Sequence, residues 1–184
     1  MALGATVYHF KIALSDVDRG VYESLDLRPA RHPSESLRFL LIRTLAYALA
    51  YEEGIAFSPG GVSSGDEPAL SIKDRTGQLT AWIEVGSPSG ERLHKATKLS
   101  ARVLIFTAAD PIALLREISR RSVHRAEGIE VFRLPPTFLD SLEGVVERTT
   151  NLEVVRSDGI LYVTVGGRVL EGTCEKFSVA DLEP

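Results

Sequence analysis

Apolar positions recur along this chain with two different periods. Between residues 6 and 28 they partly alternate with polar positions, and the turn-forming residues 15–20 divide that stretch in two. A period of two is typical of strands, so we expect the chain to open with a β-hairpin. From Pro33 to about Glu53 two apolar stripes follow the 3.6-residue period, which predicts a long helix buried on two sides and stopped by Gly54.

The second half alternates between strand and helix patterns. Strands are predicted at 102–107 and 129–134, and helices at 110–122 and 136–147. This order is typical of parallel strands joined by helical crossovers. Further β-rich runs at 152–156, 160–165 and 168–177 are separated by glycine-containing turns and predict a C-terminal β-meander. We therefore expect one α/β domain (α+β, with a mixed sheet) over residues 1–184, in which helices flank both faces of a central mixed sheet.

Composition narrows the class of protein. Hydrophobic residues make up 44% and charged residues 25% of the chain, as in soluble globular domains. The net charge of −4 argues against a protein coated in basic surface, although it says nothing of a local groove. A lone cysteine, Cys174, cannot form an internal disulfide and fits a reducing cytosol. No signal peptide or transmembrane span is recognisable, so we expect a cytoplasmic protein with no membrane partner.

The stretch from Asp66 to Lys98 carries the candidate chemistry. Residues 74–77 (DRTG) predict a type I turn that closes a hairpin. Counting outward at constant register pairs Leu70 with Trp82, Pro68 with Glu84 and Asp66 with Gly86. Asp66 and Glu84 would then share one face as diagonal neighbours, with β-carbons roughly 7 Å apart. A slip of one residue would exchange Asp66 for Glu67.

Two further elements bring charged side chains toward this hairpin. In the helix predicted from Glu91 to about Ser100, Lys95 lies at the border of the buried stripe and can place its ammonium at the sheet edge. Arg92 lies nearer the centre of that stripe and competes for the same role. Glu35 heads one apolar stripe of the long helix and points toward packed protein, although a first-turn glutamate is also favoured by the helix dipole.

Three carboxylates, Glu35, Asp66 and Glu84, suit Mg²⁺ or Mn²⁺, which prefer oxygen ligands. Such an ion polarises a phosphoryl oxygen and lowers the pKa of attacking water, while Lys95 orients that water or stabilises developing negative charge. A different interpretation is that the carboxylates only form internal ion pairs, with Arg43, Arg92 or Lys95, and bind no metal.

Short motifs resemble one known family. They are HPSES at 32–36, DEP at 66–68, WIEVG at 82–86, ERLHKA at 91–96 and the opening MALGAT. Together they resemble the YaeQ family of bacterial proteins over essentially the whole chain. That family is similar in fold to the PD-(D/E)XK nucleases, so the resemblance implies a restriction-endonuclease-like core.

The resemblance also implies roles. Glu35 would match the helix glutamate of those nucleases, Asp66 the aspartate of the PD element and Glu84 the acidic residue of the (D/E)XK element. Gly86 stands where the usual nuclease has lysine, and Lys95 is then the candidate for a migrated lysine. Proline follows Asp66 and Glu67 instead of preceding the aspartate.

The sequence gives less support to a nucleophile triad, a zinc site or a basic phosphate-binding patch. No G-x-S-x-G elbow supports a Ser/His/Asp nucleophile, and one cysteine with four scattered histidines gives no zinc spacing. A basic run, Arg116, Arg120, Arg121, His124 and Arg125, is usually a solvated face but could touch phosphates beside the acidic site.

Two functions follow from these observations. The first is a metal-dependent nuclease-like protein that hydrolyses phosphodiesters, with DNA or RNA as partner. The alternative is a non-catalytic module on the same scaffold that binds nucleic acid or a protein. The direction of Lys95 discriminates between them, because the catalytic version needs its cation beside Asp66 and Glu84.

Overall fold

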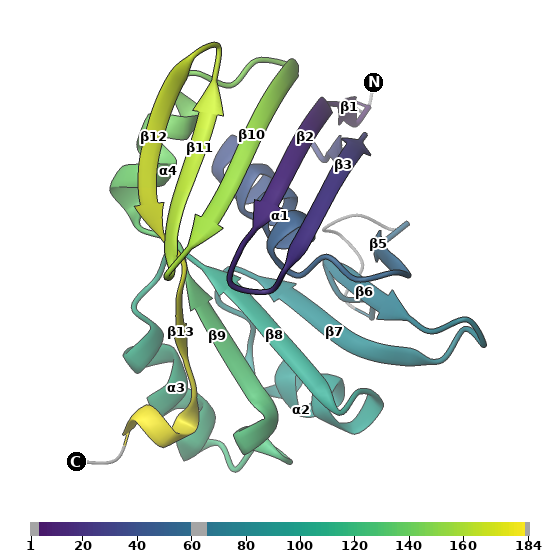
Figure 1. Cartoon of the computed structure of the whole chain (residues 1–184). Coiled ribbons are helices and arrows are strands. Elements are labelled where there is room, and N and C mark those ends of the chain that lie inside the picture. Colours follow the sequence, from purple (N-terminus) through teal and green to yellow (C-terminus); the bar gives the residue numbers. More distant parts are fainter. Residues whose placement is uncertain (1–3, 60–65, 183–184) are drawn as a thin grey trace.

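Two mixed β-sheets form the framework of the molecule (Figure 1). The computed structural model describes residues 4–59 and 66–182. The first sheet has the strand order β12-β11-β10-β2-β3 and the second the order β13-β9-β8-β7-β6-β5. The prediction of one central sheet was therefore wrong, although a mixed α/β fold is confirmed. Sheet membership depends on which distant strands pair, and local patterns carry no such information.

The first sheet joins the two ends of the chain. It consists of β2 (His9–Asp16), β3 (Val21–Leu27), β10 (Thr149–Ser157), β11 (Ile160–Val165) and β12 (Arg168–Thr173). The predicted N-terminal hairpin is β2 with β3, and the predicted meander is β10 to β12. A parallel pairing of β10 with β2 connects them.

The second sheet contains the parallel crossovers. Its strands are β5 (Ile55–Phe57), β6 (Leu70–Lys73), β7 (Leu79–Val85), β8 (Arg102–Thr107), β9 (Ile129–Arg133) and β13 (Glu175–Phe177). Strands β7, β8 and β9 are parallel, joined by helices α2 (Gly90–Leu99) and α3 (Pro111–Arg120) as the sequence predicted. Strand β13 leaves the meander to pair with β9, so the predicted strand 168–177 is divided between the sheets. A small ribbon pairs β1 (Thr6–Val7) with β4 (Ala30–Arg31).

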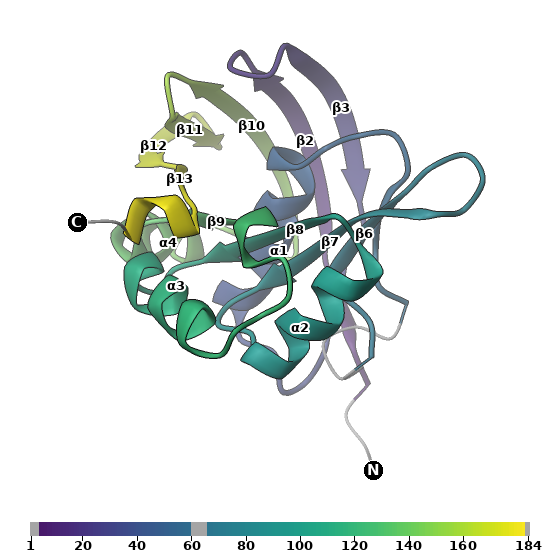
Figure 2. The same cartoon turned by 90° about the horizontal axis from the view of Figure 1, so that it is seen from below.

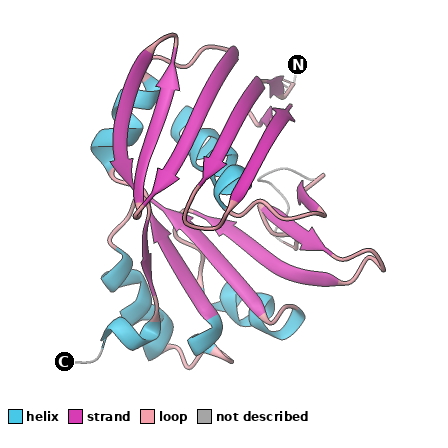
Figure 3. Ribbon diagram, viewed as in Figure 1, coloured by secondary structure: helices cyan, strands magenta, loops and turns pink. Residues whose placement is uncertain are grey.

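Helices form layers around the second sheet (Figures 1 and 3). Helix α1 (Leu37–Leu49) contacts β2 of the first sheet and β7 and β8 of the second, and α4 (Pro136–Glu143) packs against α1 and β12. A large apolar core joins the inner faces of both sheets to these two helices. A second core lies on the opposite face of the second sheet, under α2 and α3 (Figure 2). Within the described part of the chain, no helix is long and apolar enough to span a membrane.

Both ends of α1 and the end of α4 differ from the prediction. Helix α1 ends at Leu49, before the predicted stop at Gly54. Helix α1 begins at Leu37, not near Pro33, because Ser36 is the N-cap and its side chain accepts a hydrogen bond from the N–H of Phe39 at 3.1 Å. Glu35 therefore lies in the turn before the helix. Helix α4 ends at Glu143 instead of continuing to 147.

Candidate functional site

The turn between β6 and β7 forms as predicted. Asp74 Oδ1 accepts hydrogen bonds from the N–H groups of Thr76 and Gln78 at 2.8 and 3.0 Å. Gly77 has φ +85°, a conformation that favours glycine. Asp74 also donates its own N–H to the carbonyl of Gln78, so the predicted pairing of these two residues is confirmed.

A β-bulge beyond this turn changes the register. Lys73 pairs with Leu79, but Ile72 pairs with Ala81, and Leu70 then lies opposite Ile83 instead of Trp82. The predicted constant register was wrong by one residue because a bulge places an extra residue on one strand. Strand β6 also begins only at Leu70, so Asp66 and Glu67 precede the sheet and are not cross-strand neighbours of Glu84.

Glu84 is a buried carboxylate on β7, with an exposed fraction of 4%. Its Oε1 accepts hydrogen bonds from Trp82 Nε1 at 2.5 Å and from Arg92 Nε at 2.7 Å. Trp82 and Glu84 are two residues apart on one strand, so both side chains lie on the face covered by α2. Burial raises the pKa of Glu84 and outweighs the opposing effects of Trp82 and Arg92.

A cavity of about 340 Å³ lies beside Glu84. Its lining includes Glu67, Ser89 and Arg92, together with Phe39 of α1. Arg92 also donates from Nη2 to the Glu67 carbonyl oxygen, so it connects the segment before β6 to Glu84. Glu67, which the sequence offered only as an alternative to Asp66 after a slip of one residue, lines this cavity. We call this the Glu84 pocket.

Asp66 and Lys95 form a second pair at the surface. Asp66 has an exposed side-chain fraction of 91%, and Lys95 Nζ lies 2.5 Å from its Oδ1. The hydrogen bond from Lys95 and the charges of Lys95 and Arg92 lower the pKa of Asp66. Lys95 thus points toward Asp66. The catalytic hypothesis also required this cation beside Glu84, but in the described part of the chain the cation paired with Glu84 is Arg92. Arg92 also donates to the carbonyl oxygen of Glu67, the residue after Asp66, and so lies between the Asp66 and Lys95 pair and Glu84.

Glu35 belongs to a separate buried ion pair. Its two carboxylate oxygens accept hydrogen bonds from Arg43 Nε and Nη2, each at 3.1 Å, and Oε2 also accepts from the N–H of His32. Burial raises the pKa of Glu35 and outweighs the attraction of Arg43. Within residues 4–59 and 66–182, no hydrogen bond or ion pair links Glu35 to Asp66 or Glu84.

The three predicted carboxylates thus each contact a different cation. In the described ranges, no group of three or more His, Cys, Asp or Glu side chains is arranged to hold a metal ion. The donor chemistry at the Glu84 pocket nevertheless suits a hard cation, because carboxylate and carbonyl oxygens come from Glu67 and Glu84, with Asp66 nearby. Trp82 was missed as a site residue, and Glu67 was named only as the alternative to Asp66. The two-residue spacing of Trp82 and Glu84 was the available signal for the tryptophan.

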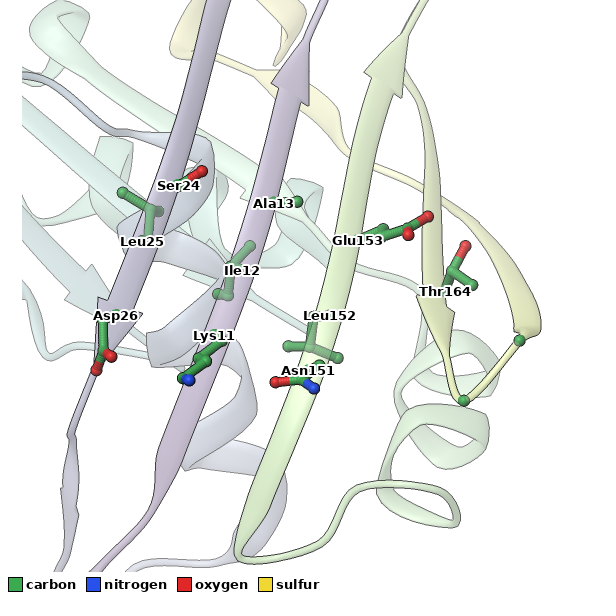
Figure 4. Close-up of a pocket in the computed structure, with 12 residues that line it drawn as sticks. Lys11, Ile12, Ala13, Ser24, Leu25, Asp26, Asn151, Leu152, Glu153 and Thr164 are labelled. Atoms are coloured by element: carbon green, nitrogen blue, oxygen red, sulfur yellow. The ribbon is translucent and has the colours of Figure 1, made fainter.

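A different hollow lies on the outer face of the first sheet (Figure 4). Its volume is about 480 Å³, and across its floor Ser24 pairs with Ala13, Ala13 with Glu153, and Glu153 with Thr164. Three side chains of this row, Ser24, Ala13 and Thr164, are small, which leaves the face hollow beside Glu153. None of the predicted site residues lines it, so it is separate from the Glu84 pocket.

Comparisons with known proteins place the chain in a family. A family model described as "YaeQ protein" matches residues 1–174. The chain belongs to the YaeQ family. Among its relatives, "Uncharacterized protein YaeQ" of Escherichia coli (strain K12) is 29% identical, over 89% of this chain and 91% of that protein. The protein of the same name from Salmonella typhi is 28% identical, over 93% and 94% of the two chains.

Solved YaeQ structures have the same fold as this chain. The crystal structure of the YaeQ protein from Pseudomonas syringae superposes with a TM-score of 0.85 at 31% identity, covering 95% of this chain and 96% of that one. The YaeQ protein from Xanthomonas axonopodis pv. citri gives a TM-score of 0.85 at 27% identity, covering 95% and 98%. The mixed α/β architecture is therefore that of the YaeQ family.

Proposed function

We propose that this YaeQ-family protein is a metal-dependent phosphodiesterase on a PD-(D/E)XK nuclease-like core, with the Glu84 pocket as its active site. The observation that carries the proposal is a buried carboxylate, Glu84, that lines a cavity and pairs with Arg92, which also binds the carbonyl of Glu67 next to Asp66. Burial of a carboxylate is costly unless the carboxylate is paired, and Glu84 is held in its buried position by Trp82 and Arg92.

Glu84 and Asp66 are the proposed ligands of Mg²⁺ or Mn²⁺. When bound, the ion supplies a Lewis acid for a phosphoryl oxygen and lowers the pKa of attacking water. The chain's own groups do the rest. Lys95 provides a positive charge beside Asp66, where negative charge develops during phosphoryl transfer, and Arg92 orients the Glu84 carboxylate. The role of Glu35 as a third metal ligand stays a prediction. Its carboxylate is hydrogen-bonded to Arg43, which a metal ion would have to displace.

The test combines metal binding with hydrolysis. Calorimetric titration of Mn²⁺ and Mg²⁺ into the wild type, Glu84→Gln, Asp66→Ala and Glu35→Gln is followed by assays on labelled DNA and RNA with each metal. We expect Glu84→Gln to abolish metal binding and to lower hydrolysis at least about 100-fold. Glu130→Gln is the matched control, because Glu130 is also paired with a cation, Lys176, on the second sheet but lies outside the Glu84 pocket.

A second candidate function is a non-catalytic binding module. It is favoured by the observation that Glu35, Asp66 and Glu84 already have cationic partners. This candidate predicts no heat of Mn²⁺ or Mg²⁺ binding at millimolar metal and no hydrolysis in any assay. Folded wild-type protein that gives both results would replace the first proposal with the second.

A further inference from the structure

Positive charge is concentrated in one continuous segment of the chain. Residues 90–125 contain eight Lys and Arg but three Asp and Glu, a net charge of +5 in a protein whose total is −4. The rest of the chain therefore carries −9. The segment comprises α2, β8, α3 and the loop after α3, and β8 is largely buried in the second sheet, between β7 and β9. Its charges are displayed mainly by α2, α3 and that loop, which lie on one face of the second sheet (Figure 2).

The exposed side of α2 carries most of its cations. Gly90, Leu93, Ala96 and Thr97 are its buried residues. At about 100° per residue, the opposite arc presents, in angular order, His94, Lys98, Glu91, Lys95, Leu99 and Arg92. Arg92 lines the Glu84 pocket, and His94 is at the far side of the arc. Cationic side chains therefore cross α2 from the pocket to its opposite flank, with one acidic residue among them.

On that flank α2 contacts the loop after α3, which carries Arg121. The rings of His94 and His124 make an edge contact with centroids 6.4 Å apart, and the N–H of His124 donates to His94 Nδ1 at 3.4 Å. Arg121 lies over Gly90, where a β-carbon would come within 2.3 Å of its Cδ. Glycine at position 90 thus allows an exposed arginine to lie across the first turn of α2, next to Ser89 of the Glu84 pocket.

The loop itself has a defined conformation. Ser122 and Arg125 have φ values of +49° and +51°, which non-glycine residues adopt only when the surroundings impose them. Val123 between them is buried in the core under α2 and α3. The loop therefore presents Arg121 and His124 in fixed positions. We define the cationic band as Arg92, Lys95, Lys98 and Arg121, with His94 and His124 lying where α2 meets the loop.

We infer that the cationic band binds the sugar-phosphate backbone of a nucleic acid and leads it to the Glu84 pocket. A row of cations on one face of an otherwise acidic protein matches a polyanion with regularly spaced charges. The surface ion pairs of Lys95 with Asp66 and of Arg121 with Glu117 contribute little energy, so they leave Lys95 and Arg121 available to phosphates. The choice of partner rests on the proposed function, whereas the binding itself does not require hydrolysis.

The test measures binding without metal. Fluorescence anisotropy of labelled duplex DNA, single-stranded DNA and single-stranded RNA is recorded in EDTA over a series of KCl concentrations. The band variant is the double substitution Lys98→Ala and Arg121→Ala. The matched control is Lys11→Ala with Arg168→Ala, two exposed cations on the first sheet. Both double variants remove the same charge, and their folding is checked by denaturant unfolding.

We expect the wild type to bind at least one of the three nucleic acids. The band variant should lower the slope of log affinity against log salt by about 2, since each phosphate contact contributes about 0.9, and should weaken binding about tenfold at low salt. The control should keep the wild-type slope. The inference is overturned if the wild type binds none of the three, or if both double variants lose the same affinity.

The two proposals fail in different ways. If binding in EDTA depends on the cationic band but no hydrolysis occurs with Mg²⁺ or Mn²⁺, the inference stands and the phosphodiesterase proposal is rejected. If Glu84→Gln abolishes hydrolysis but the band variant binds and cleaves like the wild type, the phosphodiesterase proposal stands and the cationic band is rejected.

Discussion

Two buried glutamates of this protein are each paired with the arginine eight residues further along the chain. Glu35 pairs with Arg43, and Glu84 pairs with Arg92. Arg43 has an exposed fraction of 2%, binds both oxygens of Glu35 and the Ala30 carbonyl, and lies over the Phe57 ring at 5.4 Å. Arg92, in contrast, has an exposed side-chain fraction of 23% and borders a cavity.

The difference teaches that sequence spacing does not determine the role of such a pair. Arg43 reaches its partner from within a helix that is buried between two sheets, and its surroundings leave no space for another ligand. Arg92 reaches Glu84 from the first turn of a surface helix. The Glu35 pair is therefore expected to act on stability, and the Glu84 pair on binding.

The largest expected effect comes from breaking the enclosed pair. Arg43→Ala leaves a buried carboxylate without its cation and should lower the free energy of unfolding by about 3–5 kcal/mol. Arg92→Ala should cost less than half as much, because water can enter the Glu84 pocket. Urea denaturation of both variants measures the difference. Equal losses would show that the two pairs are equivalent, contrary to the comparison.

A smaller effect is expected from the indole donor of Glu84. Trp82→Phe removes a hydrogen bond to a buried charged group, which contributes about 1.5–3 kcal/mol. A double-mutant cycle with Glu84→Gln separates this bond from lost packing, and we expect a coupling of at least about 1 kcal/mol. A coupling near zero would mean that the indole contributes by packing alone.

The pH dependence of stability sharpens the comparison further. Burial raises the pKa of both Glu35 and Glu84 above the usual value of 4.5, so the folded state binds protons more tightly than the unfolded state. Stability from each group is present below that value and is lost as pH rises through the folded pKa. Relative to Glu84→Gln, the wild type should therefore become less stable as pH rises from 4.5, and then level off.

Denaturant unfolding of the wild type, Glu35→Gln and Glu84→Gln at several pH values tests this expectation. The same sign is expected for both glutamates. A wild type that gains stability over the glutamine variants with rising pH would mean that the arginines outweigh burial.

The smallest effect is expected at the exposed pair. Lys95→Ala should leave the free energy of unfolding unchanged within error, because Asp66 is almost fully exposed and a surface pair of this kind contributes little. Hydrolysis assays on the same variant should show a marked loss under the proposed function. A clear loss of stability would instead assign Lys95 a structural role.

Local features of the site were predictable, whereas its assembly was not. The turn at Asp74 and Gly77 and the helix from about residue 90 follow from side-chain chemistry and periodicity. Lys95, however, lies on the exposed side of that helix and not at its buried border, because the buried residues are Gly90, Leu93, Ala96 and Thr97. The bulge between Ile72 and Lys73 has no such signal, and it invalidated the register on which the facing of Asp66 and Glu84 depended.

Long-range pairing limited the prediction of the fold in the same way. Each strand of the hairpin and of the meander is recognisable from its own residues. The parallel pairing of β2 with β10 joins strands about 140 residues apart, as Thr149 with His9 illustrates. Only the packing of the whole chain decides between one sheet and two, because both use the same strands.

The hydrogen bond between Trp82 and Glu84 also gives this protein a built-in optical signal. Trp82 is the single tryptophan of the sequence, and 98% of its surface is inaccessible to solvent. Its emission therefore originates entirely beside the carboxylate at the centre of the proposed site. A cation that binds Glu84, or a substitution that moves Arg92, alters the electric field on that one indole and changes the colour or yield of its fluorescence.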